Sequence, residues 1–124
     1  MVGVEQGLVA EEAARELNRA REARLRGQEG RARVCARRAA GWAASAHYRH
    51  TTGSMPPHSA LSLLKRLQQD GTIEVEIRNA AMRLTQRVTP TFEHPFPEDP
   101  LDDAQRIIDA FAAIRSQSVA GGSA

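Results

Sequence analysis

Four arginines lie close together in the sequence, at Arg31, Arg33, Arg37 and Arg38. On a helix, Arg31 and Arg38 would share one face, and Arg33 and Arg37 would share another. Guanidinium groups bind phosphate and carboxylate groups through paired hydrogen bonds. A helix that carries such a basic surface therefore predicts binding of RNA or a nucleotide through its phosphate groups.

The charge along the chain supports this prediction but also offers an alternative. The net charge is only +2, yet residues 15–49 carry +7, while residues 1–14 carry −3 and residues 90–124 carry −4. Local ion pairs are expected where Glu and Arg alternate at helical spacing, as from Glu12 to Arg19. The arginines could thus be paired within the chain, with these glutamates or with Asp99, Asp102 and Asp103. Both interpretations stay open at the level of the sequence.

The remaining reactive side chains point to no catalytic or metal site. His47 and His50 have a spacing that permits metal binding, but no Asp or Cys lies near them. Cys35, the single cysteine, lies among alanines and is expected on an inner helix face, where a thiol is inert. We find no Ser-His-Asp arrangement, phosphate loop or zinc spacing. The sequence therefore predicts no cofactor and no metal.

The sequence pattern predicts that all the elements that position these residues are helices. Apolar residues recur at helical spacing in five segments, and Gly27–Gly30 forms a break that lets the chain reverse. The segment 73–88 could begin as a strand, but its apolar residues fit a helix over its whole length. The predicted helices cover residues 5–26, 31–49, 59–69, 73–88 and 100–115.

Several residues are expected to fix the ends and the packing of these helices. Thr72 and Asp99 have the side chains of helix N-caps, and His58 is expected to start or cap the third helix. Trp42 is expected to be the one large anchor of the alanine-rich second helix. The predicted fold is an all-α, up-down bundle of four to five helices, with one domain over residues 1–115 and a disordered tail over 116–124.

Composition places the chain among water-soluble proteins. Charged residues make up 26% and hydrophobic residues 41% of the sequence. No apolar run approaches the ~20 residues of a membrane-spanning helix, and the first residues are acidic, unlike a secretory signal. One cysteine allows no internal disulfide. We therefore expect a cytoplasmic protein that does not enter the membrane.

The order of these elements resembles the HEPN domain family (higher eukaryotes and prokaryotes nucleotide-binding). The resemblance rests on the segments Ala13–Ala20, Val34–Ala46, His58–Leu64, Ile73–Val88, Phe92–Pro97 and Asp103–Phe111. It implies a helical bundle that is often a homodimer. It also implies a small nucleotidyltransferase as partner, in a toxin–antitoxin-like pair. Some members of the family are metal-independent ribonucleases with an Arg-x(4–6)-His motif.

This chain departs from the ribonuclease pattern. Arg87 and His94 match the motif formally, but Val88 stands where a polar residue is usual, and Pro90 lies inside the match. The stretch Thr91–Pro95 also lacks the Arg-Tyr-Pro sequence of some members. The leading hypothesis is a non-enzymatic, HEPN-like module that binds a partner protein or the phosphate of a nucleotide or RNA. The alternatives are a ribonuclease toxin that uses Arg87 and His94, and a structural homodimerisation domain.

Overall fold

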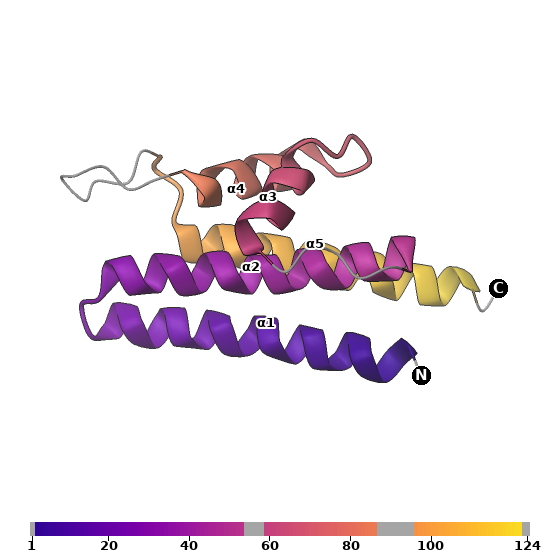
Figure 1. The fold of residues 1–124 in the computed structure, drawn as a ribbon, viewed down its shortest axis with the longest axis horizontal. Helices are drawn as coiled ribbons and strands as arrows, with labels where there is room; N and C mark the ends of the chain where they lie inside the picture. Colours follow the sequence, from indigo (N-terminus) through magenta and orange to yellow (C-terminus); the bar gives the residue numbers. More distant parts are fainter. Residues whose placement is uncertain (1, 54–58, 87–95, 123–124) are drawn as a thin grey trace.

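The computed structural model describes residues 2–53, 59–86 and 96–122, and the side chains of residues 11–53, 59–86 and 96–112. Five helices make up this part of the chain, and it contains no strand (Figure 1). The all-α prediction is confirmed, and the ambiguous segment after Ile73 is helical. The helices are α1 (Val2–Leu25), α2 (Glu29–Thr52), α3 (Ala60–Gln68), α4 (Val75–Thr85) and α5 (Pro100–Gly122).

The first two helices form an antiparallel hairpin, as the glycine break predicted. Gly27 has a φ of 75°, which glycine adopts without the steric cost that a Cβ would bring. Its amide donates to the Arg24 carbonyl at 2.9 Å, and the Gln28 amide donates to the Ala23 carbonyl at 2.8 Å. This pair of hydrogen bonds is the Schellman motif that ends many helices. The break is shorter than predicted, because Gly30 already belongs to α2.

Helix α2 is the centre of the bundle and contacts each of the four other helices. Small side chains permit this close packing: Ala32, Ala36, Ala39 and Ala40 are all fully buried, and they belong to a core shared by every helix. Figure 1 shows α1 running along one side of α2, with α3 and α4 together on another side. The alanine-rich sequence of α2 therefore lets its neighbours approach closely.

Trp42 is the exception on this helix, and the prediction that it anchors the core is wrong. Its side chain is 39% exposed, whereas Tyr48 is the large α2 side chain that is buried. The reason is the crossing of α3 over α2 at Gly41. A Cβ on Gly41 would lie 2.6 Å from the Cβ of Ala60. Trp42 lies beside this crossing instead of beneath a neighbouring helix.

Of the two N-caps predicted from the sequence, Asp99 is confirmed and Thr72 is wrong. Asp99 caps α5, since its Oδ1 accepts the Leu101 amide at 2.9 Å. Thr72 does not cap α4, which starts after Glu74. The Thr72 amide and hydroxyl instead donate to Asp70 Oδ1, at 3.0 and 2.6 Å, within the preceding turn. Ser59 caps α3 by accepting the Ser62 amide, and His58 lies outside the described residues.

The last helix is longer than the sequence indicated. Residues 116–122 continue α5, where a disordered tail was predicted. The segment from Leu101 to Ala120 contains neither glycine nor proline, so each added residue extends the helix by one hydrogen bond. Among the residues that the structure describes, no helix is both long and apolar enough to cross a membrane.

Candidate functional site

The four clustered arginines in the first half of α2 do not form one surface. Arg31 and Arg38 are exposed, and Arg37 is half-buried. Arg33 is buried, with 7% of its surface exposed, and its Nη2 donates to the main-chain carbonyls of Arg83 and Gln86. Burial, and then the nearby charge of Arg37, lower the pKa of Arg33. Arg33 thus satisfies the carbonyls at the end of α4 and is not part of an accessible basic surface.

Arg31 and Arg38 line a cavity between the two helices of the hairpin. The cavity has a volume of about 450 Å³, and Arg19 reaches it from α1. We call this cavity, which Arg19, Arg31 and Arg38 line, the arginine groove. Arg31 and Arg38 form no ion pair with any residue that the structure describes. They are therefore available to an anion from outside.

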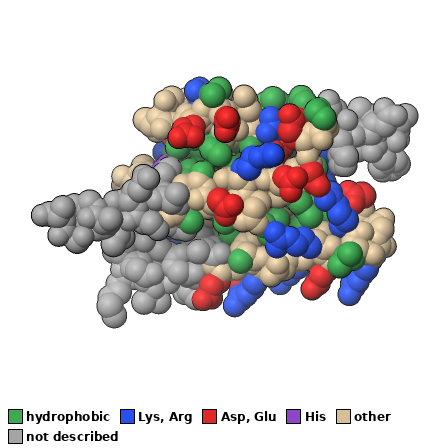
Figure 2. Space-filling view, turned by 180° about the vertical axis from the view of Figure 1, so that it is seen from behind, with side chains coloured by type: hydrophobic (Ala, Val, Ile, Leu, Met, Phe, Trp, Pro, Cys, Tyr) green, Lys and Arg blue, Asp and Glu red, His purple; other side chains and the backbone are tan. Residues whose placement is uncertain are grey.

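Most arginines of α1 are bound to acidic side chains of the same chain. Arg15 pairs with Glu12 at 2.6 Å. Arg24 holds both Glu29, at 2.8 Å, and the N-cap residue Asp99, at 3.0 Å. The hydrogen bonds to Asp99, and secondly to Glu29, raise the pKa of Arg24. Figure 2, which views the molecule from behind, shows basic and acidic side chains interspersed on that face. Internal pairing thus accounts for these α1 arginines but not for Arg31 and Arg38.

A buried carboxylate joins α4 to α5. Asp103 is 1% exposed and accepts two hydrogen bonds from Arg83, at 2.9 and 2.8 Å. Arg106 donates to the same carboxylate at 2.7 Å. The hydrogen bonds from Arg83 to Asp103 raise the pKa of Arg83. This cluster fixes one helix against the other, and its charges are satisfied within the protein.

Glu16 lies at the inner wall of the arginine groove and is 7% exposed. Its Oε1 accepts a hydrogen bond from Arg19 at 2.8 Å. Its Oε2 is buried and accepts no hydrogen bond from the residues that the structure describes. A charged oxygen left unpaired in the interior is costly. A ligand with a hydrogen-bond donor could pair with this oxygen, and Glu16 therefore suits this part of the hairpin to such a ligand.

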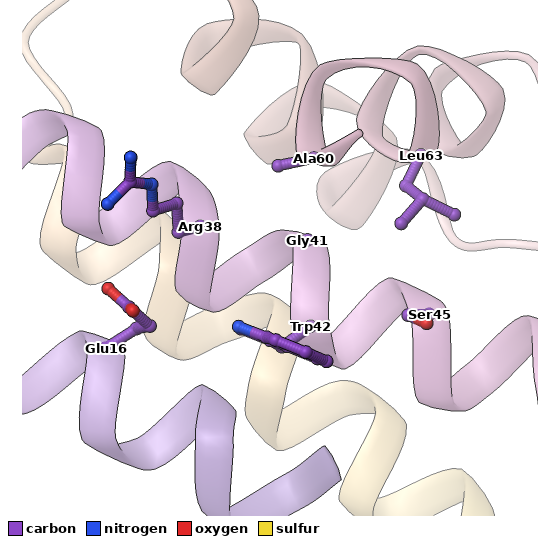
Figure 3. Close-up of a pocket in the computed structure, with 7 residues that line it drawn as sticks. All are labelled: Glu16, Arg38, Gly41, Trp42, Ser45, Ala60 and Leu63. Carbon is purple, nitrogen blue, oxygen red and sulfur yellow. The ribbon is translucent and has the colours of Figure 1, made fainter. Parts of the chain in front are cut away.

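A second cavity continues from the arginine groove toward α3, and Glu16 and Arg38 line both. Its volume is about 390 Å³. Figure 3 shows Glu16 and Arg38 at one end of this second cavity, with Trp42 and Ser45 farther along α2. Ala60 and Leu63 of α3 close it from the other side. One end of this cavity is thus charged, and the adjoining end contains the exposed indole ring of Trp42.

The other predicted candidates do not join this site. Arg87 and His94 lie outside the described residues, so the ribonuclease hypothesis stays a prediction. His47 is a core residue, stacked on Phe111 with ring centroids 4.3 Å apart. The described residues contain no group of three His, Cys, Asp or Glu side chains placed to hold a metal. Cys35 is buried, as its alanine surroundings predicted.

Sequence reasoning missed Glu16 and the role of Trp42 beside it. A signal for Glu16 was present, since Ala13, Leu17 and Ala20 form the buried face of α1 and Glu16 has the spacing of that face. An acidic residue in an apolar helix stripe marks a buried charge. No comparable signal existed for Trp42, because its exposure depends on where α3 crosses α2.

Comparison with known proteins gave no match to a protein-family model, to a curated protein or to a solved structure. The resemblance to HEPN proteins, the homodimer and the nucleotidyltransferase partner therefore stay predictions.

Proposed function

We propose that this chain is a non-enzymatic helical module that binds the phosphate groups of RNA or of a nucleotide in the arginine groove. The observation that supports this proposal is that Arg31 and Arg38 form no ion pair with the described residues. Both are exposed, both line one cavity, and neither has an ion-pair partner among the described residues. Most arginines of the neighbouring helix are engaged with carboxylates.

The electrostatics of the groove favour an anion. Its four charged side chains are three arginines and Glu16, which leaves a surplus of positive charge. Arg19 is bound to Glu16 at 2.8 Å, so Arg31 and Arg38 are the groups that would meet a phosphate. Guanidinium groups match the geometry of phosphate oxygens and form charge-assisted hydrogen bonds with them. Release of counterions from the nucleic acid would add to the affinity.

The test is a titration of fluorescently labelled single-stranded RNA with the full chain at about 50 mM and about 200 mM NaCl. We expect binding that weakens with salt. The double variant Arg31→Ala/Arg38→Ala should lower the affinity at least about tenfold and reduce the salt slope by about one to two. The matched control is Arg21→Ala/Lys65→Ala, which removes two exposed positive charges outside the groove.

Each outcome decides between the hypotheses. Absence of RNA or nucleotide binding at low salt, or equal losses in both double variants, would contradict the proposal. Cleavage of the RNA during the titration, abolished by His94→Ala, would favour the ribonuclease hypothesis instead. Salt-dependent self-association without RNA binding would favour a homodimer whose basic face meets the acidic helix α5.

A further inference from the structure

The unpaired oxygen of Glu16 restricts which ligand can fill the site. Oε2 is buried without a hydrogen-bond partner, while Oε1 is held by Arg19. A carboxylate can only accept hydrogen bonds. A group that completes the site from outside the described part of the chain is therefore a hydrogen-bond donor.

The charge around Glu16 argues against a cation as that donor. Arg19, Arg31 and Arg38 line the same cavity as this single carboxylate, so a further positive charge would meet more repulsion than attraction. A neutral donor group on a ligand that also carries negative charge suits the site better. Nucleotides have this combination, with N–H groups on the base and charge on the phosphate.

Trp42 offers the surface on which a base would lie. It is the one tryptophan of the chain, it is 39% exposed, and it lines the cavity that Glu16 and Arg38 also line. Aromatic side chains bind unpaired bases by stacking on their faces. The Ser45 hydroxyl, on the same wall, can donate to or accept from a polar group of the base.

The hydrogen-bonding groups on the edge of the base determine which of the four common nucleotides matches the Glu16 carboxylate. Guanine presents two adjacent donors, N1–H and the N2 amino group, which match the two oxygens of a carboxylate. Adenine and cytosine place a ring nitrogen acceptor beside their amino group, and uracil flanks its single donor with two carbonyl oxygens. Each of these acceptors would be repelled by the Glu16 carboxylate.

We infer that the site is specific for guanine, either as a free nucleotide or as a base of single-stranded RNA. The base stacks on Trp42, its N1–H and N2 amino group donate to Glu16, and the positive charge of Arg31 and Arg38 attracts the phosphate groups. This inference rests on the phosphate-binding function proposed above. Because Oε2 is shielded from solvent, binding requires a side-chain rotation at the groove.

Trp42 also supplies the measurement, because it is the only tryptophan. We would titrate the full chain with GMP, IMP, AMP, CMP and UMP, follow indole fluorescence, and measure affinities independently by equilibrium dialysis. We expect GMP to quench the fluorescence and to bind at least about tenfold more tightly than AMP, CMP or UMP. IMP, which lacks the N2 amino group, should fall between GMP and AMP. Guanine-containing and guanine-free RNA oligomers then show whether the site prefers RNA over the free nucleotide.

The variant Glu16→Gln keeps the size of the side chain and removes its charge. It should weaken GMP binding at least about tenfold and change AMP binding by less than about twofold. Glu12→Gln is the matched control, one turn earlier on α1 and paired with Arg15. Circular dichroism of both variants confirms that the helices are retained.

Equal affinity for all the nucleotides, with loss of binding in Arg31→Ala/Arg38→Ala, would overturn the guanine inference and leave phosphate binding standing. Absence of binding by every nucleotide and by RNA at low salt would overturn both. GMP preference that survives Glu16→Gln, or GMP binding that leaves the Trp42 fluorescence unchanged, would place the base elsewhere and so contradict the inference.

Discussion

Asp103 is the residue whose charge is best satisfied inside this protein. It is 1% exposed, and both of its oxygens accept hydrogen bonds from arginines, two from Arg83 and one from Arg106. Arg83 is itself largely buried, with 16% of its side chain exposed. Because a buried charge without its partner is strongly destabilising, the stability of the α4–α5 contact depends on this carboxylate.

The first prediction concerns Asp103→Asn. The change keeps the size of the side chain but removes the buried charge that Arg83 contacts and leaves Arg83 only the more distant Glu98, at 3.9 Å, so we expect the free energy of unfolding to fall by about 3 kcal/mol. Urea denaturation followed by circular dichroism measures this loss. Asp102→Asn, the exposed neighbour in the same helical turn, should change stability by less than about 0.5 kcal/mol. Similar losses in the two variants would show that the buried cluster has no special role.

At the scale of elements, the crossing of α2 and α3 depends on one glycine. A Cβ on Gly41 would lie 2.6 Å from the Cβ and 2.9 Å from the Cα of Ala60. The second contact involves the main chain of α3, so a change of side-chain rotamer cannot relieve it. The crossing also sets how far Trp42 is exposed, and hence the shape of the cavity beside it.

We predict that Gly41→Ala destabilises the fold by about 1–3 kcal/mol, since α3 must move away from α2. Gly30→Ala, in the first turn of the same helix, should instead stabilise it by about 0.5–1 kcal/mol, because nothing lies within 4 Å of the added Cβ. Thermal or urea unfolding of both variants measures the two effects. If Gly41→Ala were as stable as Gly30→Ala, the helices would not approach as closely as described.

Local signals in the sequence were enough to predict the helices themselves. The cap Asp99 is encoded within a few residues of where it acts, and it is confirmed. Contacts between distant segments were not encoded in this way. Arg33 looks like its neighbours Arg31 and Arg37, yet it is buried, because its carbonyl partners lie at the end of α4, 50 and 53 residues away. The exposure of Trp42 likewise depends on α3.

For the whole molecule, the position of α2 is the dominant feature. It contacts α1, α3, α4 and α5, and twelve of its residues are buried. Helix α3 is short, with nine residues, and only three of them are buried. Opening α3 therefore exposes far less apolar surface than displacing α2 does, and the two helices should differ in local stability.

Native-state hydrogen exchange tests this difference. We predict that the amides of α2 between Cys35 and Tyr48 exchange only on global unfolding, with rates at least about a hundredfold lower than those of α3. The same measurement on Gly41→Ala should accelerate exchange in α3 more than in α1. Equal protection of α2 and α3 would mean that the bundle opens as a single cooperative unit.

The central helix α2 precedes α3, α4 and α5 in the sequence, and this order has a consequence for synthesis on the ribosome. Chains fold from the N-terminus as they emerge, so α1 and α2 can close across the Gly27 turn before the other helices exist. The groove residues Glu16, Arg19, Arg31 and Arg38 all belong to this first hairpin. The nascent hairpin could thus present its basic groove early, while the alanine face that α5 later covers is still open. We expect that half-made chain to be the stage most prone to aggregate or to bind a chaperone.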